Sequence, residues 1–164
     1  AGAERPNMLI VLVDDHAFEA ISAYNSYLKD HIQTPSIDRV ANEGMRFDNM
    51  TVSTSICSPC RASLLTGQHG HVNGVRTLNR GINETSPQYP VQLQKAGYQT
   101  WLVGKWHLGS PDSCGSVIKA ERGGYESWLA ANLLEFVSNS YDTRLYDSNN
   151  EEVRLPGYLS LIHI

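Results

Sequence analysis

The chain has 164 residues, of which 41% are hydrophobic and 18% are charged, a globular composition that suffices for one ordinary domain. Its net charge of −4 gives no support for broad binding to nucleic acid or anionic membranes, and no apolar run is long enough to span a bilayer. Three cysteines leave at least one unpaired, so no disulfide framework is expected. A polyanionic ligand would have to be met by a local basic pocket.

The first expected element is a buried strand at residues 8–13, which are six consecutive apolar residues. The run ends on Asp14 and Asp15, and functional groups in open α/β sheets gather at the carboxyl ends of strands. Two adjacent carboxylates repel each other unless a cation lies between them, so the pair predicts a site for a hard divalent cation. The alternative is that one aspartate caps the next helix and the other is solvated.

Two further elements are expected before the next cluster of reactive residues. Helical spacing is weak over 17–29 but clear over 35–43, where Thr34 can cap the helix and Gly44 can end it. Residues 45–52 alternate loosely between apolar and polar, which favours a strand that returns to the sheet.

A cysteine opens the next predicted helix, which Gly67 ends. Cys57 therefore lies at a helix N-terminus, where unpaired backbone N–H groups and the helix dipole favour an anion. Arg61 follows one turn later, so its guanidinium can reach back toward Cys57. This combination predicts an oxyanion site. The nearby His69 and His71 lack zinc-like partners and are interpreted as surface or pocket-rim residues.

A short amphipathic helix is expected over 91–96, followed by a second buried strand over 100–104. If the chain stays extended beyond this strand, Lys105 and His107 face one pocket and Trp106 packs behind them. The alternative is a strand end with a solvated lysine and a histidine bonded to backbone.

The last third of the chain is less informative. Residues 123–136 are partly compatible with a helix, and strands at 141–146 and 151–155 form a plausible hairpin around a four-residue turn. Residues 159–164 fit no expected element, and we interpret them as a non-native tail derived from a sequencing adapter.

The phrase Cys-Ser-Pro-Cys-Arg, followed by Thr66-Gly67, and the phrase Gly-Lys-Trp-His-Leu-Gly at 104–109 resemble the two signatures of the type I sulfatases. This formylglycine-dependent family belongs to the alkaline-phosphatase-like superfamily, and the specific resemblance covers residues 5–109. It implies an α/β fold with a central, mostly parallel sheet flanked by helices. Residues 1–158 would then be the N-terminal part of a truncated catalytic domain.

The resemblance also implies the chemistry of the site. Cys57 would be oxidised to formylglycine by a formylglycine-generating enzyme or a radical maturase, and the hydrated aldehyde would be the nucleophile. Asp14, Asp15 and residue 57 would hold Ca²⁺, with Mg²⁺ as an alternative. Arg61 would steady the nucleophile. Lys105 and His107 would contact the sulfate and the formylglycine.

The implied function is hydrolysis of sulfate monoesters on a small molecule or glycan. The phrase at 14–24 is similar to carbohydrate sulfatases, including those that act on 6-O-sulfated N-acetylglucosamine. The family's remaining metal and sulfate ligands come from a later part of the chain, so this chain alone is expected to be inactive. Export to the periplasm, the cell exterior or a lysosome-like compartment is expected by resemblance alone.

Two alternatives remain. One is a phosphonate or phosphodiester hydrolase of the same superfamily. The other is a thiol redox module that uses Cys57 and Cys60, which form a C-x-x-C motif.

Overall fold

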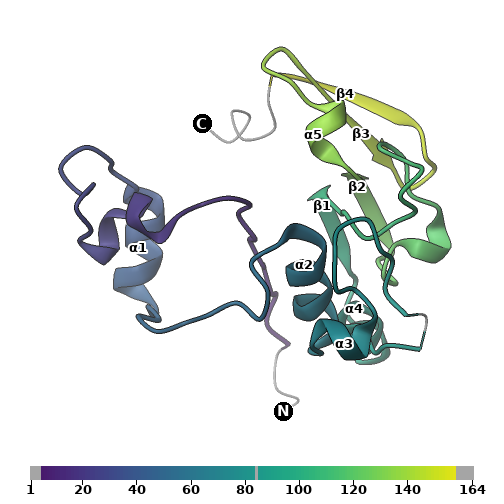
Figure 1. Ribbon diagram of the computed structural model, residues 1–164, viewed down its shortest axis with the longest axis horizontal. Coiled ribbons are helices and arrows are strands. Elements are labelled where there is room, and N and C mark those ends of the chain that lie inside the picture. The colour runs from purple at the N-terminus through teal and green to yellow at the C-terminus, as the bar shows by residue number, and fades with distance from the viewer. Residues whose placement is uncertain (1–4, 84, 158–164) are drawn as a thin grey trace. The chain divides into compact units, whose positions relative to one another are not determined.

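The computed structural model describes residues 5–83 and 85–157, and the chain divides into two compact units, residues 1–51 and 52–164 (Figure 1). The non-native tail predicted at 159–164 lies outside the described residues. None of the helices described has the length and apolar character needed to cross a bilayer.

In the first unit, one aspartate ties the short helices together. The unit contains the 3₁₀ turns Phe18–Ala20 (η1) and Ser22–Tyr24 (η2) and the helix Pro35–Glu43 (α1), which ends at Gly44 as expected. Asp38 accepts hydrogen bonds from the Ser22 hydroxyl at 2.6 Å and the Thr34 hydroxyl at 2.9 Å. Thr34 is the N-cap residue of α1, but its hydroxyl donates to this carboxylate and accepts no hydrogen bond from a helix N–H. The Ser22 hydrogen bond is the main reason that the pKa of Asp38 is lowered.

The two strands expected in the first unit do not form. Residues 8–13 and 45–52 carry no strand assignment, and the six apolar side chains of the first run are between 45% and 88% exposed. A strand requires a hydrogen-bonded neighbour and cover for its apolar face, and the described residues of this unit provide neither. The apolar pattern was recognised correctly, but the conclusion that it forms a strand in this chain was wrong.

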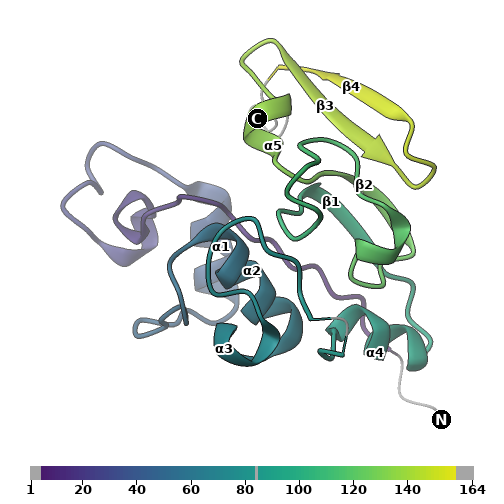
Figure 2. The ribbon, with the colours of Figure 1, turned by 45° about the vertical axis from the view of Figure 1, so that its right-hand side comes forward.

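The second unit contains a four-stranded sheet (Figures 1 and 2), and its α/β class agrees with the prediction. The strand order is β1-β2-β3-β4, with β1 parallel to β2 and the two other pairings antiparallel. The sheet is therefore mixed, and parallel pairing is limited to β1 and β2. The strands are Trp101–Lys105 (β1), Ser127–Ala131 (β2), Asp142–Asp147 (β3) and Glu152–Pro156 (β4).

Helices accompany this sheet: Cys57–Thr66 (α2), Gly70–Asn73 (α3), Tyr89–Lys95 (α4), the 3₁₀ turn Lys119–Glu121 (η3) and Leu134–Val137 (α5). The expected 91–96 helix is confirmed as α4, which begins two residues earlier. In contrast, residues 123–136 contain β2 as well as α5, so the helical interpretation of that segment was largely wrong.

Strand β2 separates two apolar clusters because its side chains alternate between the faces of the sheet. Trp128 and Ala130 belong to the cluster that includes Ala62 and Leu65 of α2. The next residue, Ala131, joins the other cluster with residues of α5 and β3. Burial of β2 on both faces fixes α2 against the sheet, and α2 carries the cysteine of the predicted site.

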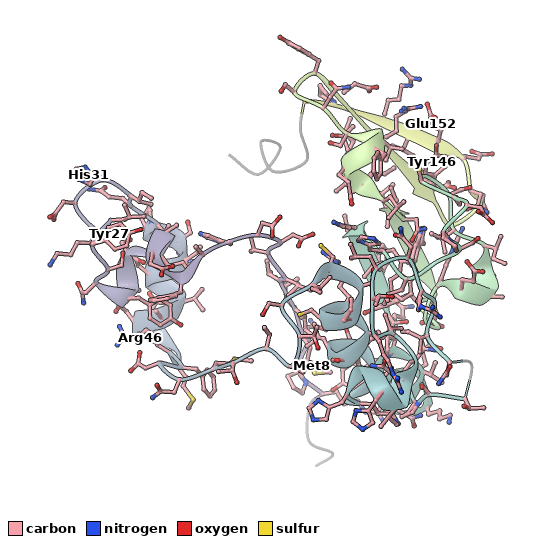
Figure 3. The ribbon with its side chains drawn as sticks, viewed as in Figure 1. Met8, Tyr27, His31, Arg46, Tyr146 and Glu152 are labelled. Carbon is pink, nitrogen blue, oxygen red and sulfur yellow. The ribbon has the colours of Figure 1, made fainter. Side chains whose placement is uncertain are left out.

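The predicted hairpin is confirmed as β3 and β4, and Figure 3 shows Tyr146 and Glu152, which pair across it.

A buried arginine, Arg122, connects the turn of the β3–β4 hairpin to the core. The guanidinium of Arg122 donates to the carbonyls of Val117 at 3.0 Å and Ser148 at 2.8 Å, and to the Asn150 side chain at 2.5 Å. It also lies 5.1 Å from the centre of the Trp128 ring. Burial lowers the pKa of Arg122, and the nearby Asp147 opposes this shift.

Candidate active site

Helix α2 presents Cys57 as its first residue, as the sequence predicts. The preceding Ile56 is the extended N-cap, and Gly67 ends the helix in the left-handed region with φ of +67°. The Cys60 N–H closes the first helical turn on the Ile56 carbonyl at 2.9 Å. The half-buried Cys57 thus lies beside N–H groups of the first turn, which have no partner within the helix itself. This is a suitable environment for an anionic group at position 57.

Lys105, the last residue of β1, lies next to the N-terminus of α2. Its Nζ atom lies 3.7 Å from Cys57 Sγ and 3.1 Å from a carboxylate oxygen of Glu135 in α5. Burial tends to raise the pKa of Glu135, but hydrogen bonds from its own backbone N–H and from Lys105 outweigh burial, so the net shift is downward. The Lys105 ammonium group therefore lies between a thiol and a carboxylate. Sequence analysis missed Glu135, because nothing in its local spacing marks it as a partner of Lys105.

Arg61 joins the same two elements. Its Nη1 atom donates to the Lys105 carbonyl at 2.7 Å, a contact that connects α2 to the end of β1. The sequence predicted a guanidinium directed toward Cys57 along the helix. The structure shows its contact with the Lys105 carbonyl, and the approach of the guanidinium to Cys57 stays a prediction.

His107 lies beyond the end of β1 and differs from its expected conformation. The sequence argument assumed an extended chain through residue 107, but His107 has φ of +58°. Trp106 packs in the core as expected, against Trp128 at a centroid distance of 5.4 Å. The buried His107 donates its backbone N–H to the Asn132 carbonyl at 2.8 Å, so pairing with β2 continues past the strand end.

Asn79 holds the imidazole of His107. The Nε2 atom lies 3.2 Å from Asn79 Oδ1, and Asn79 itself has φ of +57°. An amide oxygen can only accept, so this pairing puts the ring proton on Nε2 in the neutral imidazole. Sequence analysis missed Asn79, which is 28 residues away and belongs to no recognised motif.

The acidic pair belongs to the first unit. Asp14 and Asp15 form a turn directly after residues 8–13, both are exposed, and Asp15 has φ of +52°. Their oxygen ligands suit a hard cation such as Ca²⁺ or Mg²⁺. Among the residues that the structure describes, no group of three or more His, Cys, Asp or Glu side chains could hold a metal ion. The cation site predicted from Asp14, Asp15 and Cys57 draws on both units and stays a prediction.

The C-x-x-C motif has a different setting from that of a thioredoxin-like domain. No disulfide joins Cys57 or Cys60 to another described cysteine. A redox motif of that kind follows the first strand of a βαβ unit, whereas no strand is described before α2 in the second unit. The local fold therefore does not support the redox alternative.

Comparison with known protein families gives a match to a family model described as "Sulfatase". The match covers residues 6–160. That match spans nearly the whole chain. The chain belongs to the sulfatase family.

Individual sulfatases show the extent of this similarity. The chain is 45% identical over 105 residues to an N-acetylglucosamine-6-O-sulfatase of Bacteroides thetaiotaomicron. The aligned region covers 64% of this chain and 18% of that protein. It is 43% identical over 114 residues to human arylsulfatase G, and this aligned region covers 65% of this chain and 21% of the relative. The chain therefore spans about a fifth of the length of these sulfatases.

A solved structure agrees with this assignment. A protein determined in complex with its substrate D-glucosamine-2-N,6-O-disulfate matches with a TM-score of 0.79 and 34% identity. The match covers 97% of this chain and 29% of that protein. The predicted sulfatase fold is thus confirmed for a part of the family's full architecture.

Proposed function

We propose that this sulfatase-family chain contributes the nucleophile end of an active site that hydrolyses sulfate monoesters on a sulfated carbohydrate. The observation that carries the proposal is the 3.7 Å approach of the Lys105 ammonium group to Cys57 Sγ at the start of α2. A sulfate ester brings negative charge to its reaction partner, and preorganised positive groups stabilise that charge. The relatives named as carbohydrate sulfatases support a sugar substrate, including one related to 6-O-sulfated N-acetylglucosamine.

The chain's own residues would bind and orient the sulfate. Lys105 supplies a cation beside position 57, and its ion pair with Glu135 limits where the ammonium group can point. Arg61 fixes the backbone of Lys105 relative to α2. His107, whose Nε2 lies 3.2 Å from Asn79 Oδ1, would contact the sulfate and the formylglycine. Each of these groups is positioned before substrate arrives.

Two further components are part of the proposal. Formylglycine made from Cys57 would supply the nucleophile, and a divalent cation at Asp14 and Asp15 would neutralise sulfate charge. A formylglycine-generating enzyme or a radical maturase would be the partner that modifies Cys57. We further propose an exported protein, as is common among such sulfatases.

The modification can be tested on the chain itself. Coexpression with a formylglycine-generating enzyme should convert the peptide that contains position 57 to an aldehyde, seen as a mass change and as reaction with a hydrazide probe. Cys57→Ala should abolish both signals, whereas Cys114→Ala should retain them. An unmodified Cys57 under conditions that modify a known sulfatase would contradict the proposal.

The reaction requires a separate test. The protein extended over the length of its relatives should hydrolyse a sulfated aminosugar faster than the matching phosphate ester. Asp14→Asn together with Asp15→Asn should remove the increase in the rate of sulfate ester hydrolysis that added Ca²⁺ produces. Preference for the phosphate or phosphonate ester would favour the alternative hydrolase of the same superfamily.

A further inference from the structure

Two neighbouring hollows in the second unit are lined by basic side chains. The first, of about 410 Å³, is lined by His71, Arg76 and Arg80 together with Gly74 and Thr77. The second, of about 380 Å³, is also lined by His71 and Arg76, and adds His69 with Ser53, Thr54 and Gly70. Because they share two residues, we treat them as one feature, the basic hollow, defined by His69, His71, Arg76 and Arg80.

The positive charge of the basic hollow is not neutralised within the described part of the chain. Neither Arg76 nor Arg80 forms an ion pair with a described carboxylate, whereas Arg46, Arg144 and Arg154 on other surfaces each do. The rings of His69 and His71 stack at a centroid distance of 5.9 Å and an interplanar angle of 11°. An imidazole has an N–H donor in either protonation state. The hollow therefore offers charge and donors suited to an oxyanion.

The loop that forms the hollow is held by a buried side chain. Asn73 is fully buried, its Nδ2 donates to the Gln68 carbonyl at 2.9 Å, and its Oδ1 accepts the Val75 N–H at 2.9 Å. Gly74 has φ of +87°, and a Cβ atom there would lie 2.6 Å from Asn83 Oδ1. These contacts fix the backbone that carries His71 and Arg76, so the basic side chains project from a defined loop.

The basic hollow is close in sequence to the candidate active site at two points. Ser53 and Thr54 line it and precede Cys57 by only a few residues along the chain. On the other side, Arg80 follows Asn79, whose side chain contacts His107 at 3.2 Å. A ligand with its reacting group near Cys57 and His107 could thus place a second group in the hollow.

We propose that the basic hollow is an accessory subsite for a second anionic group, a sulfate or a carboxylate, on the same glycan. The substrate class would then be a multiply anionic oligosaccharide, not a neutral sugar with a single sulfate. The assignment of the ligand as a substrate rests on the function proposed above, but anion binding by the hollow does not.

Binding of a heparin-derived tetrasaccharide to the unmodified chain, measured by calorimetry, tests the proposal. Arg76→Gln combined with Arg80→Gln should weaken binding by roughly tenfold or more, since two charge-assisted contacts are lost. The matched control, Arg144→Gln with Arg154→Gln, makes the same charge change on the β3–β4 hairpin and should alter binding less than about twofold. Equal losses in both double variants, or no binding by the parent chain, would overturn the subsite.

Additional ligands separate the possible sources of the anion. A hyaluronan tetrasaccharide carries carboxylates without sulfate, whereas inorganic sulfate provides sulfate without sugar. If Arg76→Gln with Arg80→Gln weakens the binding of either ligand, the subsite is supported. The ligand that is affected identifies the anionic group as a carboxylate or a sulfate. Binding of a neutral chitin tetrasaccharide with the same sensitivity would contradict a role for charge.

Measurements of KM and kcat/KM distinguish this proposal from the proposed function. In the protein extended over the length of its relatives, the double variant should raise KM for a multiply anionic oligosaccharide and leave kcat/KM for a singly sulfated monosaccharide unchanged. Equal losses on both substrates would overturn the subsite's role in substrate choice. Anion binding without any sulfatase activity would contradict the proposed function and leave the subsite standing.

Discussion

The contact between Lys105 and Cys57 predicts the reactivity of the unmodified thiol. Iodoacetamide reacts with the anionic form of a cysteine sulfur, and a neighbouring cation attracts that anion as it reacts. At the observed 3.7 Å, two unit charges interact by about 1 kcal/mol in water and about 4.5 kcal/mol at an effective dielectric of 20. The Glu135 carboxylate, 3.1 Å from the same ammonium group and partly exposed, offsets much of this attraction. We expect a net effect of about 1 kcal/mol, or roughly a fivefold change in rate.

The assay is alkylation of Cys57 near neutral pH, in a chain whose other cysteines, Cys60 and Cys114, are replaced by serine. Lys105→Met should slow the reaction roughly fivefold, whereas Glu135→Gln should accelerate it, because the ammonium group then acts on the thiolate alone. Lys95→Met, at the exposed end of α4, is the control and should leave the rate unchanged. An unchanged rate in Lys105→Met, or a slower one in Glu135→Gln, would refute the electrostatic argument.

Three other predictions concern the second unit, each measured by urea unfolding. Gly74→Ala should destabilise it by about 1–2 kcal/mol, because a left-handed residue gains a Cβ atom against Asn83. Gly81→Ala should cost less, because its Cβ atom would lie at an ordinary contact distance of 3.6 Å from the Leu108 carbonyl oxygen. Arg122→Met should cost about 2–4 kcal/mol, since it leaves buried carbonyls without their donor, and a loss below 1 kcal/mol would contradict this role. Glu135 has a pKa below its ordinary value of 4.5, so its stabilisation is present above that pH and is lost as the pH falls through the lower, folded-state pKa. Glu135→Gln should therefore flatten the acid limb of the stability profile, and an unchanged limb would contradict the assignment.

Local signals predicted several elements well. The helix start at Cys57 and its end at Gly67 follow from a helix-forming run and a glycine stop, both of which act within one turn. The hairpin follows from two alternating runs around a polar turn. The approach of Lys105 to Cys57 came from family resemblance, because spacing alone cannot bring together residues that are 48 positions apart.

The errors arose where tertiary structure decides. The argument for Lys105 and His107 on one side assumed regular alternation, but the left-handed backbone at His107 breaks it just after β1. Asn79 and Glu135 escaped notice because their partners come from the fold and not from sequence spacing. Strand β2 was missed because glycines and aromatic residues precede it and its own alternation is short.

The failed strand at residues 8–13 is informative in its own right. Six adjacent apolar side chains are stable in a strand only when both faces are covered, yet here each is at least 45% exposed. The edge strand β1 repeats the pattern, with Trp101 67% and Val103 62% exposed on one face. In the second unit, β2 satisfies the same requirement because α2 and α5 contribute to the clusters on its two faces. The apolar pattern therefore specifies which surfaces need cover, and only the presence of the covering elements turns it into a strand.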